Sequence, residues 1–404
     1  MSELSYLGKL LDGVEVEWKM LGEVIHSLKT GLNPRQNFSL NTLDAQGYYV
    51  TVREIQNGKV VFLDKTDRVN DRALKIINGR SNLEAGDILF SGTGTVGRIA
   101  VIEENPINWN IKEGVYTIKP IKEKIAPRFL SYLLQSSKIV KDYSKKIVGN
   151  PVISLPMGDL KKLLIPIPCP DIPEKSLAIQ SEIVRILDKF TALTAELTAE
   201  LNMRKKQYNY YRDQLLSFKE GEVEWKTLGE VAVIGTGNHD TQDAIEHGKY
   251  IFYARGREPL KLNVFDFDET AIITAGDGAG VGKVFHYAKG KYALHQRAYR
   301  IVPNAFMNPR FVYHYITAYF FTYIQKASVS SSVTSLRRPM FLKFPIPVPP
   351  SEEQARIVEI LDKFDTLTNS ITEGLPREIE LRQKQYEYYR DLLFSFPKPE
   401  TVSN

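Results

Sequence analysis

The stretch "EVEWKMLGEV" at residues 15–24 returns as "EVEWKTLGEV" at residues 222–231, with nine of ten positions identical. A second stretch, "IVRILDKF" at 183–190, returns as "IVEILDKF" at 357–364. Similarity at this level, in the same order along the chain, indicates an internal duplication, and repeats have to be found before any fold is assigned.

The duplication extends to the end of each half. "RKKQYNYYRDQLLSF" (204–218) returns as "RQKQYEYYRDLLFSF" (382–396), and a proline-rich stretch precedes each helical copy, "IPIPCP" at 165–170 and "FPIPVPP" at 344–350. One order of elements is therefore written twice: an opening strand, a variable region, a proline-rich stretch and a long helix.

The two variable regions differ from each other. Residues 25–164 and 232–343 share little beyond a glycine-rich turn, "SGTGTVGRI" (91–99) against "AGDGAGVGKV" (275–284). A molecule with one framework and two different reading regions would have this organisation.

Both predicted long helices carry apolar residues at steps of three and four, which is typical of coiled coils. "TALTAELTAEL" (191–201) contains "TAEL" twice, a four-residue insertion into the heptad pattern. The second helix is four residues longer, and "TEGLP" (372–376) should kink or briefly break it. We expect the two helices to pack on each other as an antiparallel coiled coil; independent homodimeric coils are the alternative.

The start of the chain resembles the end of a long helix. "GKLLDGVEVEW" (8–18) aligns with "LLSFKEGEVEW" (215–225), so residues 4–11 correspond to a helix end whose beginning is absent. The C-terminal helix, ending at Phe396, would supply the missing neighbour, and the two ends of the chain should then lie close together.

The composition is that of a globular protein: 404 residues, 43% hydrophobic, 25% charged, with a net charge of +5. A single cysteine, Cys169, excludes an intrachain disulfide and fits a reducing cytoplasm. No signal peptide or run of apolar residues of membrane-spanning length is apparent, so we expect a cytoplasmic protein without a membrane partner.

The variable regions have the pattern of mixed α/β domains. Alternating apolar and β-branched residues predict strands, and an apolar face predicts one helix in each region. The predicted strands are 47–52, 59–63, 86–91 and 115–120, then 249–254, 270–275, 283–288 and 297–303; the helices are 128–146 and 309–326.

Basic and amide residues are concentrated in the loops between these strands. Such side chains contact base edges and phosphates in DNA complexes, although each one alone is more often a solvated loop residue. The candidates are Lys29, Asn33, Arg35, Gln36, Asn37, Arg53, Thr93, Thr95 and Arg98 in the first region, and His239, Arg255, Arg257, Lys283, His295, Gln296 and Arg297 in the second.

Catalytic motifs fail on inspection. In "AGDGAGVGKV", Asp277 stands where a phosphate-binding loop needs its first glycine, and Val284 stands where the hydroxyl residue should be. The repeated "EWK" matches half of a nuclease motif but lacks an acidic partner. The histidines and the one cysteine have no zinc spacing. The pattern predicts a binding protein without a catalytic or metal site.

The repeated "EWK-LGEV", "IPIP", "ILDKF" and "RKKQYNYYRDQLLSF" segments resemble the specificity subunits of type I restriction–modification systems, most closely the type IC branch. The resemblance implies two mixed α/β target-recognition domains separated by two long antiparallel coiled-coil helices with pseudo-twofold internal symmetry. The implied boundaries are 1–14 for the N-terminal helix end, 15–164 for recognition domain 1, 165–221 for the central helix region, 222–343 for recognition domain 2 and 344–404 for the distal helix region.

The resemblance also implies the partners. Each recognition domain would read one half of a split site in double-stranded DNA. Two modification subunits would bring S-adenosylmethionine, and two restriction subunits would use ATP and Mg²⁺, while this chain would bind no cofactor and carry no catalysis. The implied candidates for the modification-subunit interface are Tyr208, Tyr210, Tyr211, Arg212, Tyr386, Tyr388, Tyr389 and Arg390, some of which fit a coiled-coil core equally well.

In this branch the number of "TAEL" copies is tied to the unread gap between half-sites, which would make Thr194, Leu197, Thr198 and Leu201 the length-setting segment. A further copy lengthens a helix by about 6 Å and rotates the residues beyond it by roughly 40°. Two alternatives stay open: a nuclease or methyltransferase with its own centre, and a coiled-coil scaffold without DNA binding.

Overall fold

The computed structural model describes residues 4–11, 13–34, 37–219, 221–327, 335–370 and 372–397. The chain forms two compact units. Unit 1 contains Met1–Glu196 and Glu380–Asn404, and unit 2 contains Leu197–Ile379. Each unit is mixed α/β and combines one variable region with segments of the long helices, as the repeat predicts.

Unit 1 is built on a four-stranded sheet in the order β2-β10-β7-β8, next to a three-stranded sheet in the order β6-β3-β9 and a short pair, β4-β5. Helix α3 buries Phe129 and Leu133 in the same hydrophobic cluster as Phe90 and Ile118 of the larger sheet. The elements are β2 (Ile25–Thr30), β3 (Gly47–Val50), β4 (Ile55–Gln56), β5 (Lys59–Val60), β6 (Arg68–Val69), α2 (Asp71–Arg80), β7 (Ile88–Ser91), β8 (Ile99–Val101), β9 (Trp109–Ile111), β10 (Val115–Pro120), α3 (Pro127–Leu133), α4 (Ser137–Ser144) and α5 (Met157–Lys161), with 3-10 turns η1 (Leu21–Glu23) and η2 (Val52–Glu54).

Unit 2 contains a six-stranded sheet in the order β13-β18-β16-β17-β14-β15. Helix α8 packs Phe311, Ile316 and Phe320 against Ile272 and Ile301 of this sheet. The elements are α7 (Leu228–Val231), β13 (Ala232–Thr236), η3 (Thr241–Asp243), β14 (Tyr250–Tyr253), β15 (Leu260–Leu262), β16 (Phe267–Ala275), β17 (Phe285–Leu294), β18 (Ala298–Pro303), α8 (Pro309–Ala327) and α9 (Arg338–Leu342).

The repeated opening strand and the proline-rich stretch pair with each other in both units. In unit 1, β1 (Val16–Met20) lies antiparallel to β11 (Leu164–Pro168), with Trp18 opposite Pro166. In unit 2, β12 (Glu224–Thr227) pairs in the same way with β19 (Pro345–Val348), with Trp225 opposite Pro347. Each variable region therefore begins and ends at one two-stranded sheet.

The prolines fit this pairing because they stand two residues apart. Just before β11, Leu163 O accepts a hydrogen bond of 2.8 Å from Leu21 N. Just after it, Cys169 N donates a hydrogen bond of 2.8 Å to Glu15 O. Those odd-numbered positions supply the ladder, so the absent N–H groups of Pro166 and Pro168 fall where no bond to β1 is required. Cys169 takes part here through its backbone.

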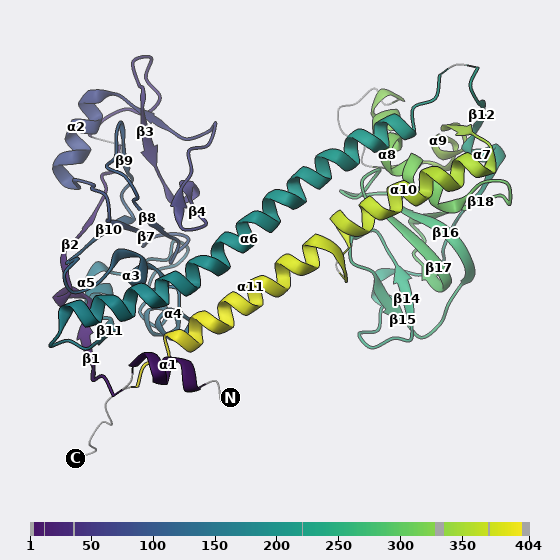
Figure 1. Ribbon diagram of the computed structural model, residues 1–404. Coiled ribbons are helices and arrows are strands. Elements are labelled where there is room, and N and C mark those ends of the chain that lie inside the picture. Colours follow the sequence, from purple (N-terminus) through teal and green to yellow (C-terminus); the bar gives the residue numbers. More distant parts are fainter. Residues whose placement is uncertain are drawn as a thin grey trace. The chain divides into compact units, whose positions relative to one another are not determined.

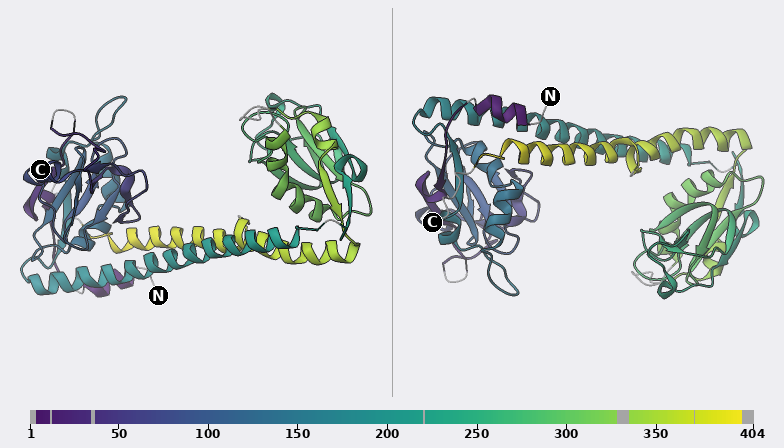
Figure 2. Two further views of the ribbon diagram at one scale, coloured as in Figure 1. Left: turned by 90° about the horizontal axis from the view of Figure 1, so that it is seen from above. Right: turned by 90° about the horizontal axis from the view of Figure 1, so that it is seen from below.

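The first long helix, α6 (Pro173–Leu215), is continuous for 43 residues, whereas the second is divided into α10 (Ser351–Asn369) and α11 (Gly374–Leu393) (Figures 1 and 2). The break falls at the predicted "TEGLP". Gly374 has φ +78°, and a Cβ there would lie 2.3 Å from Thr366 O, so another residue would be strained.

The helices contact each other within each unit through equivalent residues. In unit 1, Phe190 of α6 stacks on Tyr389 of α11 with centroids 5.3 Å apart. In unit 2, Phe364 of α10 stacks on Tyr211 of α6 at 5.6 Å, and both pairs have an interplanar angle of 25°. Early α6 thus meets late α11, and late α6 meets α10, which is the chain order of antiparallel packing within one chain.

The two ends of the chain meet in unit 1, as predicted. Helix α1 (Leu4–Leu11) buries Leu7 and Leu11 in the same cluster as Phe394 and Phe396. Trp18 Nε1 donates a hydrogen bond of 2.8 Å to Pro397 O. The C-terminal segment therefore completes the neighbourhood of the N-terminal helix end.

Three expectations about local structure were wrong in part. The helix expected at 128–146 is two helices, because Ser136 N and Oγ both bond Leu133 O and end α3. Of the strand expected at 59–63, only Lys59–Val60 (β5) forms a strand. The steps of three and four along the first long helix predict a packed face through Ile183, Ile186, Phe190, Leu193, Leu197, Leu201, Arg204, Tyr208, Tyr211 and Leu215. Leu193 and Tyr211 are 37% and 45% exposed, whereas Leu187, which is not in this set, is fully buried.

Replacing Phe396 by alanine tests the closure at the chain ends. Phe396 is buried beside Phe129, with centroids 6.3 Å apart, so Phe396→Ala should lower the free energy of unfolding by about 3–5 kcal/mol. Ile107→Ala, at a side chain that is 81% exposed, is the control and should change it little. Equal stability of the two variants in urea titrations would show that the C-terminal segment is not part of the core.

Candidate nucleic-acid interface

In unit 2 the strand ends bring together five of the seven predicted residues. His239 follows β13, Arg255 follows β14, and His295, Gln296 and Arg297 form the turn between β17 and β18. A parallel β-bridge joins His239 and His295 directly. These residues were distant in sequence, and the sheet order places their loops at one edge.

Asp277 holds the two arginines of this group. Arg255 Nη1 donates to Asp277 Oδ1 at 2.9 Å, and Arg297 Nη1 donates to Oδ2 at 3.1 Å. Partial burial disfavours the charged carboxylate, but the two guanidinium groups outweigh it and lower the pKa of Asp277. The arginines are thereby oriented side by side, with Arg297 still 63% exposed.

Asp240 orders the polar residues beside them. Its Oδ2 accepts a hydrogen bond of 3.0 Å from Gln296 Nε2. The backbone N–H of Gln242 and then the amide of Gln296 lower the pKa of Asp240. His239 Nε2 lies 3.0 Å from Asp266 Oδ1. The cluster combines fixed donors with fixed acceptors, which is what recognition of base edges requires.

His295 is a structural member of the cluster rather than a free contact. It is buried, and its Nδ1 accepts a hydrogen bond of 2.9 Å from Arg297 N. Burial, together with the charge of Arg255, lowers the pKa of His295. His295, predicted as a DNA contact, thus has a buried side chain that supports the turn carrying Gln296 and Arg297.

The other two residues predicted in unit 2 lie elsewhere on its loops. Lys283 is exposed in the turn between β16 and β17, with Nζ 4.9 Å from the centre of the Phe321 ring. Arg257 is exposed in the loop between β14 and β15. Both remain candidates for phosphate contacts, without the fixed geometry of Arg255 and Arg297.

Unit 1 presents a smaller group around the glycine-rich turn between β7 and β8. Arg98 Nη1 donates to Val52 O at 3.1 Å, so Arg98 lies against the turn that carries Arg53. Arg53 pairs with Asp67 at 3.2 Å. Thr95 is exposed in the same turn, and Thr93 Oγ1 lies 3.2 Å from Ser154 Oγ. Arg53, Thr95 and Arg98 thus remain accessible together.

The remaining residues predicted in unit 1 follow the first strand of the sheet. Lys29 is exposed on β2, and Asn37 Nδ2 donates to Asn33 O at 2.8 Å. Arg35 and Gln36 lie outside the described residues.

A group of aromatic residues in unit 1 was missed from the sequence. Phe62 is 41% exposed and stacks on Tyr48 with centroids 4.2 Å apart, and Trp109 contacts Phe62 edge-on at 6.0 Å. The guanidinium of Arg68 lies 3.8 Å from the Tyr48 ring. The sequence predicts a strand over "KVVFL" (59–63), which would not set Phe62 apart from its neighbours. In the structure β5 ends at Val60, so Phe62 lies beyond the strand and is free to stack on Tyr48.

The catalytic alternatives find no support in the described parts of the chain. The two "EWK" segments are local ion pairs on β1 and β12, Glu17 with Lys19 at 2.9 Å and Glu224 with Lys226 at 3.3 Å. Both glycine-rich segments are turns between antiparallel strands, as expected. No group of three His, Cys, Asp or Glu side chains suited to a metal ion occurs among the residues described.

Comparison with known proteins agrees with this arrangement. The family model described as "Type I restriction modification DNA specificity domain" matches twice, at residues 14–204 and 220–381. The chain is 42% identical over 441 residues to the Escherichia coli type I restriction enzyme EcoR124I/EcoR124II specificity subunit, with all of both chains covered. It is 38% identical to the E. coli EcoprrI specificity subunit, covering 92% of this chain and 93% of that one.

Solved structures support the fold. The crystal structure of a type I restriction–modification S subunit from M. genitalium has a TM-score of 0.59 at 17% identity, covering 96% of this chain and 98% of that one. A second, titled for complex assembly and conformational transition of a type I system, has a TM-score of 0.54, covering 94% and 97%. The chain belongs to the type I restriction modification DNA specificity family. Within the described ranges, no helix is long and apolar enough to cross a bilayer.

Arg297→Gln tests the cluster in unit 2. If Arg297 contacts a base edge or phosphate, the variant should weaken binding of the assembled complex to its duplex by about 1–3 kcal/mol. Lys363→Gln on α10, which also removes one exposed positive charge, is the control. Fluorescence anisotropy at fixed salt measures the affinity of both variant complexes for the duplex. Equal affinities would show that Arg297 does not contact the DNA.

Proposed function

We propose that this chain is the sequence-specific DNA-binding subunit of a type I restriction–modification complex, in which each variable region reads one half of a split target. The observation that carries this proposal is the pairing of two unlike loop clusters with one duplicated framework. In unit 2 one carboxylate, Asp277, holds both Arg255 and Arg297, whereas in unit 1 Arg53 pairs with Asp67 and Arg98 donates to the carbonyl of Val52. Two different sets of donors would read two different half-sites.

The chain would supply specificity and assembly while its partners supply the chemistry. We expect two modification subunits, which carry S-adenosylmethionine, and two restriction subunits, which use ATP and Mg²⁺, with all of them acting on DNA in the cytoplasm. The chain itself would hold no cofactor.

The exposed tyrosines of the long helices are the proposed docking points for the modification subunits. Tyr210 and Tyr388 are 62% and 47% exposed, and each contacts its neighbour, Tyr211 or Tyr389, edge-on. Tyr208 and Tyr386 are instead half-buried against the hydrophobic clusters of units 2 and 1, and this burial raises the pKa of each to about 12. Arg212 and Arg390 lie over the rings of Tyr208 and Tyr386, so each repeat presents the same combination.

Methylation in cells tests the proposal. The chain would be co-expressed with a type IC modification subunit in a host without other adenine methylation, and its DNA sequenced for methyladenine. We expect one split motif with a fixed unread gap. An assembled complex that methylates no motif would contradict DNA reading and favour the scaffold interpretation.

Inserting "TAEL" after Leu201 tests the length-setting segment. Thr194, Leu197 and Leu201 are half-buried on one face of α6, and Thr198 is exposed, so four added residues keep the helix and advance it by about 6 Å. The gap should lengthen by one base pair. Thr198→Ser with Glu200→Gln, which preserves length, should keep the original gap. An unchanged gap after insertion would show that this segment does not set it.

A further inference from the structure

Each recognition domain is attached to its long helix by a buried glutamine. In unit 1, Gln180 of α6 is fully buried; its Oε1 accepts from Ala126 N at 2.8 Å, and its Nε2 donates to Lys124 O at 3.0 Å. The oxygen and the nitrogen of the Gln180 amide therefore both bind backbone groups just before α3. Such a bond satisfies a donor that a helix start would otherwise leave unpaired.

The same attachment recurs in unit 2. Gln354 of α10 is buried; its Oε1 accepts from Asn308 N at 2.6 Å, just before α8, and its Nε2 donates to Phe306 O at 3.3 Å. Gln180 and Gln354 are eight residues before the repeated Asp188 and Asp362. The two helices thus use one side chain at one position to hold two otherwise different domains.

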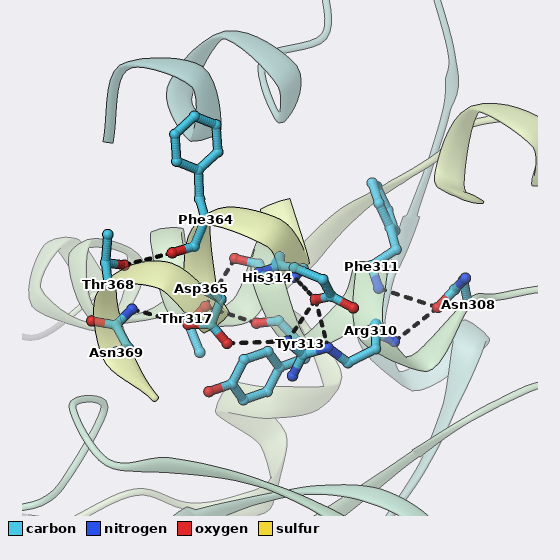
Figure 3. A network of polar contacts seen from close by, with 11 residues as sticks. Asn308, Arg310, Phe311, Tyr313, His314, Thr317, Phe364, Asp365, Thr368 and Asn369 are labelled. Carbon is cyan, nitrogen blue, oxygen red and sulfur yellow. Dashed lines mark hydrogen bonds and ion pairs between the residues drawn. The ribbon is translucent and has the colours of Figure 1, made fainter. Parts of the chain in front are cut away.

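A charged contact adds a second point of attachment. In unit 1, Arg128 Nη2 donates to Asp188 Oδ1 at 2.7 Å, and the Tyr132 hydroxyl donates to the same oxygen at 2.7 Å. In unit 2, Arg310 donates to Asp362 Oδ1 from Nη2 at 2.6 Å and from Nε at 2.9 Å (Figure 3 shows Arg310 and its surroundings).

The charged contact in unit 2 is the more extended of the two. His314 takes the place of Tyr132, with its Nε2 2.7 Å from Asp362 Oδ1, and Arg310 Nη2 also reaches Asp365 at 3.1 Å (Figure 3). Burial disfavours the carboxylate of Asp362, but His314 and Arg310 outweigh this effect and lower its pKa.

These polar contacts join α6 to the start of α3 and α10 to the start of α8, and they restrict the geometry of each junction more than they stabilise it. The amides of Gln180 and Gln354 are buried, so they demand one geometry, because a buried donor or acceptor left unpaired is costly. The charged pairs are partly exposed, with Asp188 and Asp362 at 38% and 37%, and add direction through charge-assisted hydrogen bonds. The two points are eight residues apart, about 12 Å of helix, and Phe129 or Phe311 is buried in the same hydrophobic cluster as the helix. Two polar points and one aromatic contact leave a domain one orientation on its helix.

We propose that Gln180 with the Arg128–Asp188 pair, and Gln354 with the Arg310–Asp362 pair, are positioning residues that fix the pose of each recognition domain and thereby the length of the unread gap. The inference rests on the proposed function, because it concerns how precisely that function is executed. A base-pair step is about 3.4 Å, so a domain free to rock on its helix would accept targets with neighbouring gaps.

The experiment uses the full chain with its modification subunit and counts methyladenine at motifs whose gap is normal, one shorter or one longer. Asp188→Asn and Asp362→Asn remove one charge from each attachment. Each should raise methylation at neighbouring gaps roughly tenfold, as expected when a charge-assisted contact is lost. The controls are Glu182→Gln and Glu359→Gln, which weaken ion pairs made within α6 and α10 to Arg185 and Lys363. They should behave as the parent chain.

Arg310→Lys provides a second variant in case Asp362→Asn does not fold, because it retains the charge and loses the two-pronged geometry. It should raise methylation at neighbouring gap lengths, but less than Asp362→Asn does. Variants that methylate only the normal gap, at full or reduced extent, would overturn the inference. If the parent chain itself gives no split motif, it is the proposed function that fails.

Discussion

Everything in this chain depends on one strand pairing that is made twice. β1 with β11 and β12 with β19 bring the first and last residues of each variable region together at a two-stranded sheet, directly before a long helix. A region whose two ends are adjacent can differ freely in between without disturbing the framework. This constraint explains how 25–164 and 232–343 can share so little sequence inside nearly identical boundaries.

The framework was predictable from sequence because its signals are local and repeated. The helix break at "TEGLP", the stutter in α6 and the meeting of the chain ends all follow from spacing and from alignment of the two copies. The loops were predicted less well, because the arginines and amides alone do not show which carboxylate orients them. In unit 2, Asp277 orients Arg255 and Arg297, and Asp240 orients Gln296. Nothing in the sequence shows that these two aspartates are the partners of those side chains. His295 shows the converse, since the sequence predicts a DNA contact for a histidine whose side chain is buried beneath the turn.

The attachment of each domain to its helix was missed for a different reason. Gln180 and Gln354 stand within repeated helical sequence, where a polar residue is ordinarily assigned to solvent. Their partners, Ala126 and Asn308, contribute backbone groups, which leave no signature in sequence. Pro127-Arg128-Phe129 and Pro309-Arg310-Phe311 do repeat, but three residues within regions that otherwise differ do not stand out. Only the three-dimensional structure places Arg128 on Asp188 and Arg310 on Asp362.

The central claim is that one framework presents two independent readers in equivalent positions. The most direct measurement replaces residues 232–343 by a second copy of residues 25–162, the part of the first variable region that corresponds to it when Pro166 is aligned with Pro347. Asp365→Thr then restores the threonine that Tyr132 contacts at Thr191 in unit 1. Sequencing of methyladenine from cells that also express the modification subunit then reports the target. The account predicts a split motif in which both half-sites are the first half-site of the parent chain. An intact complex that retains the parent's second half-site, or methylates no motif, would contradict it.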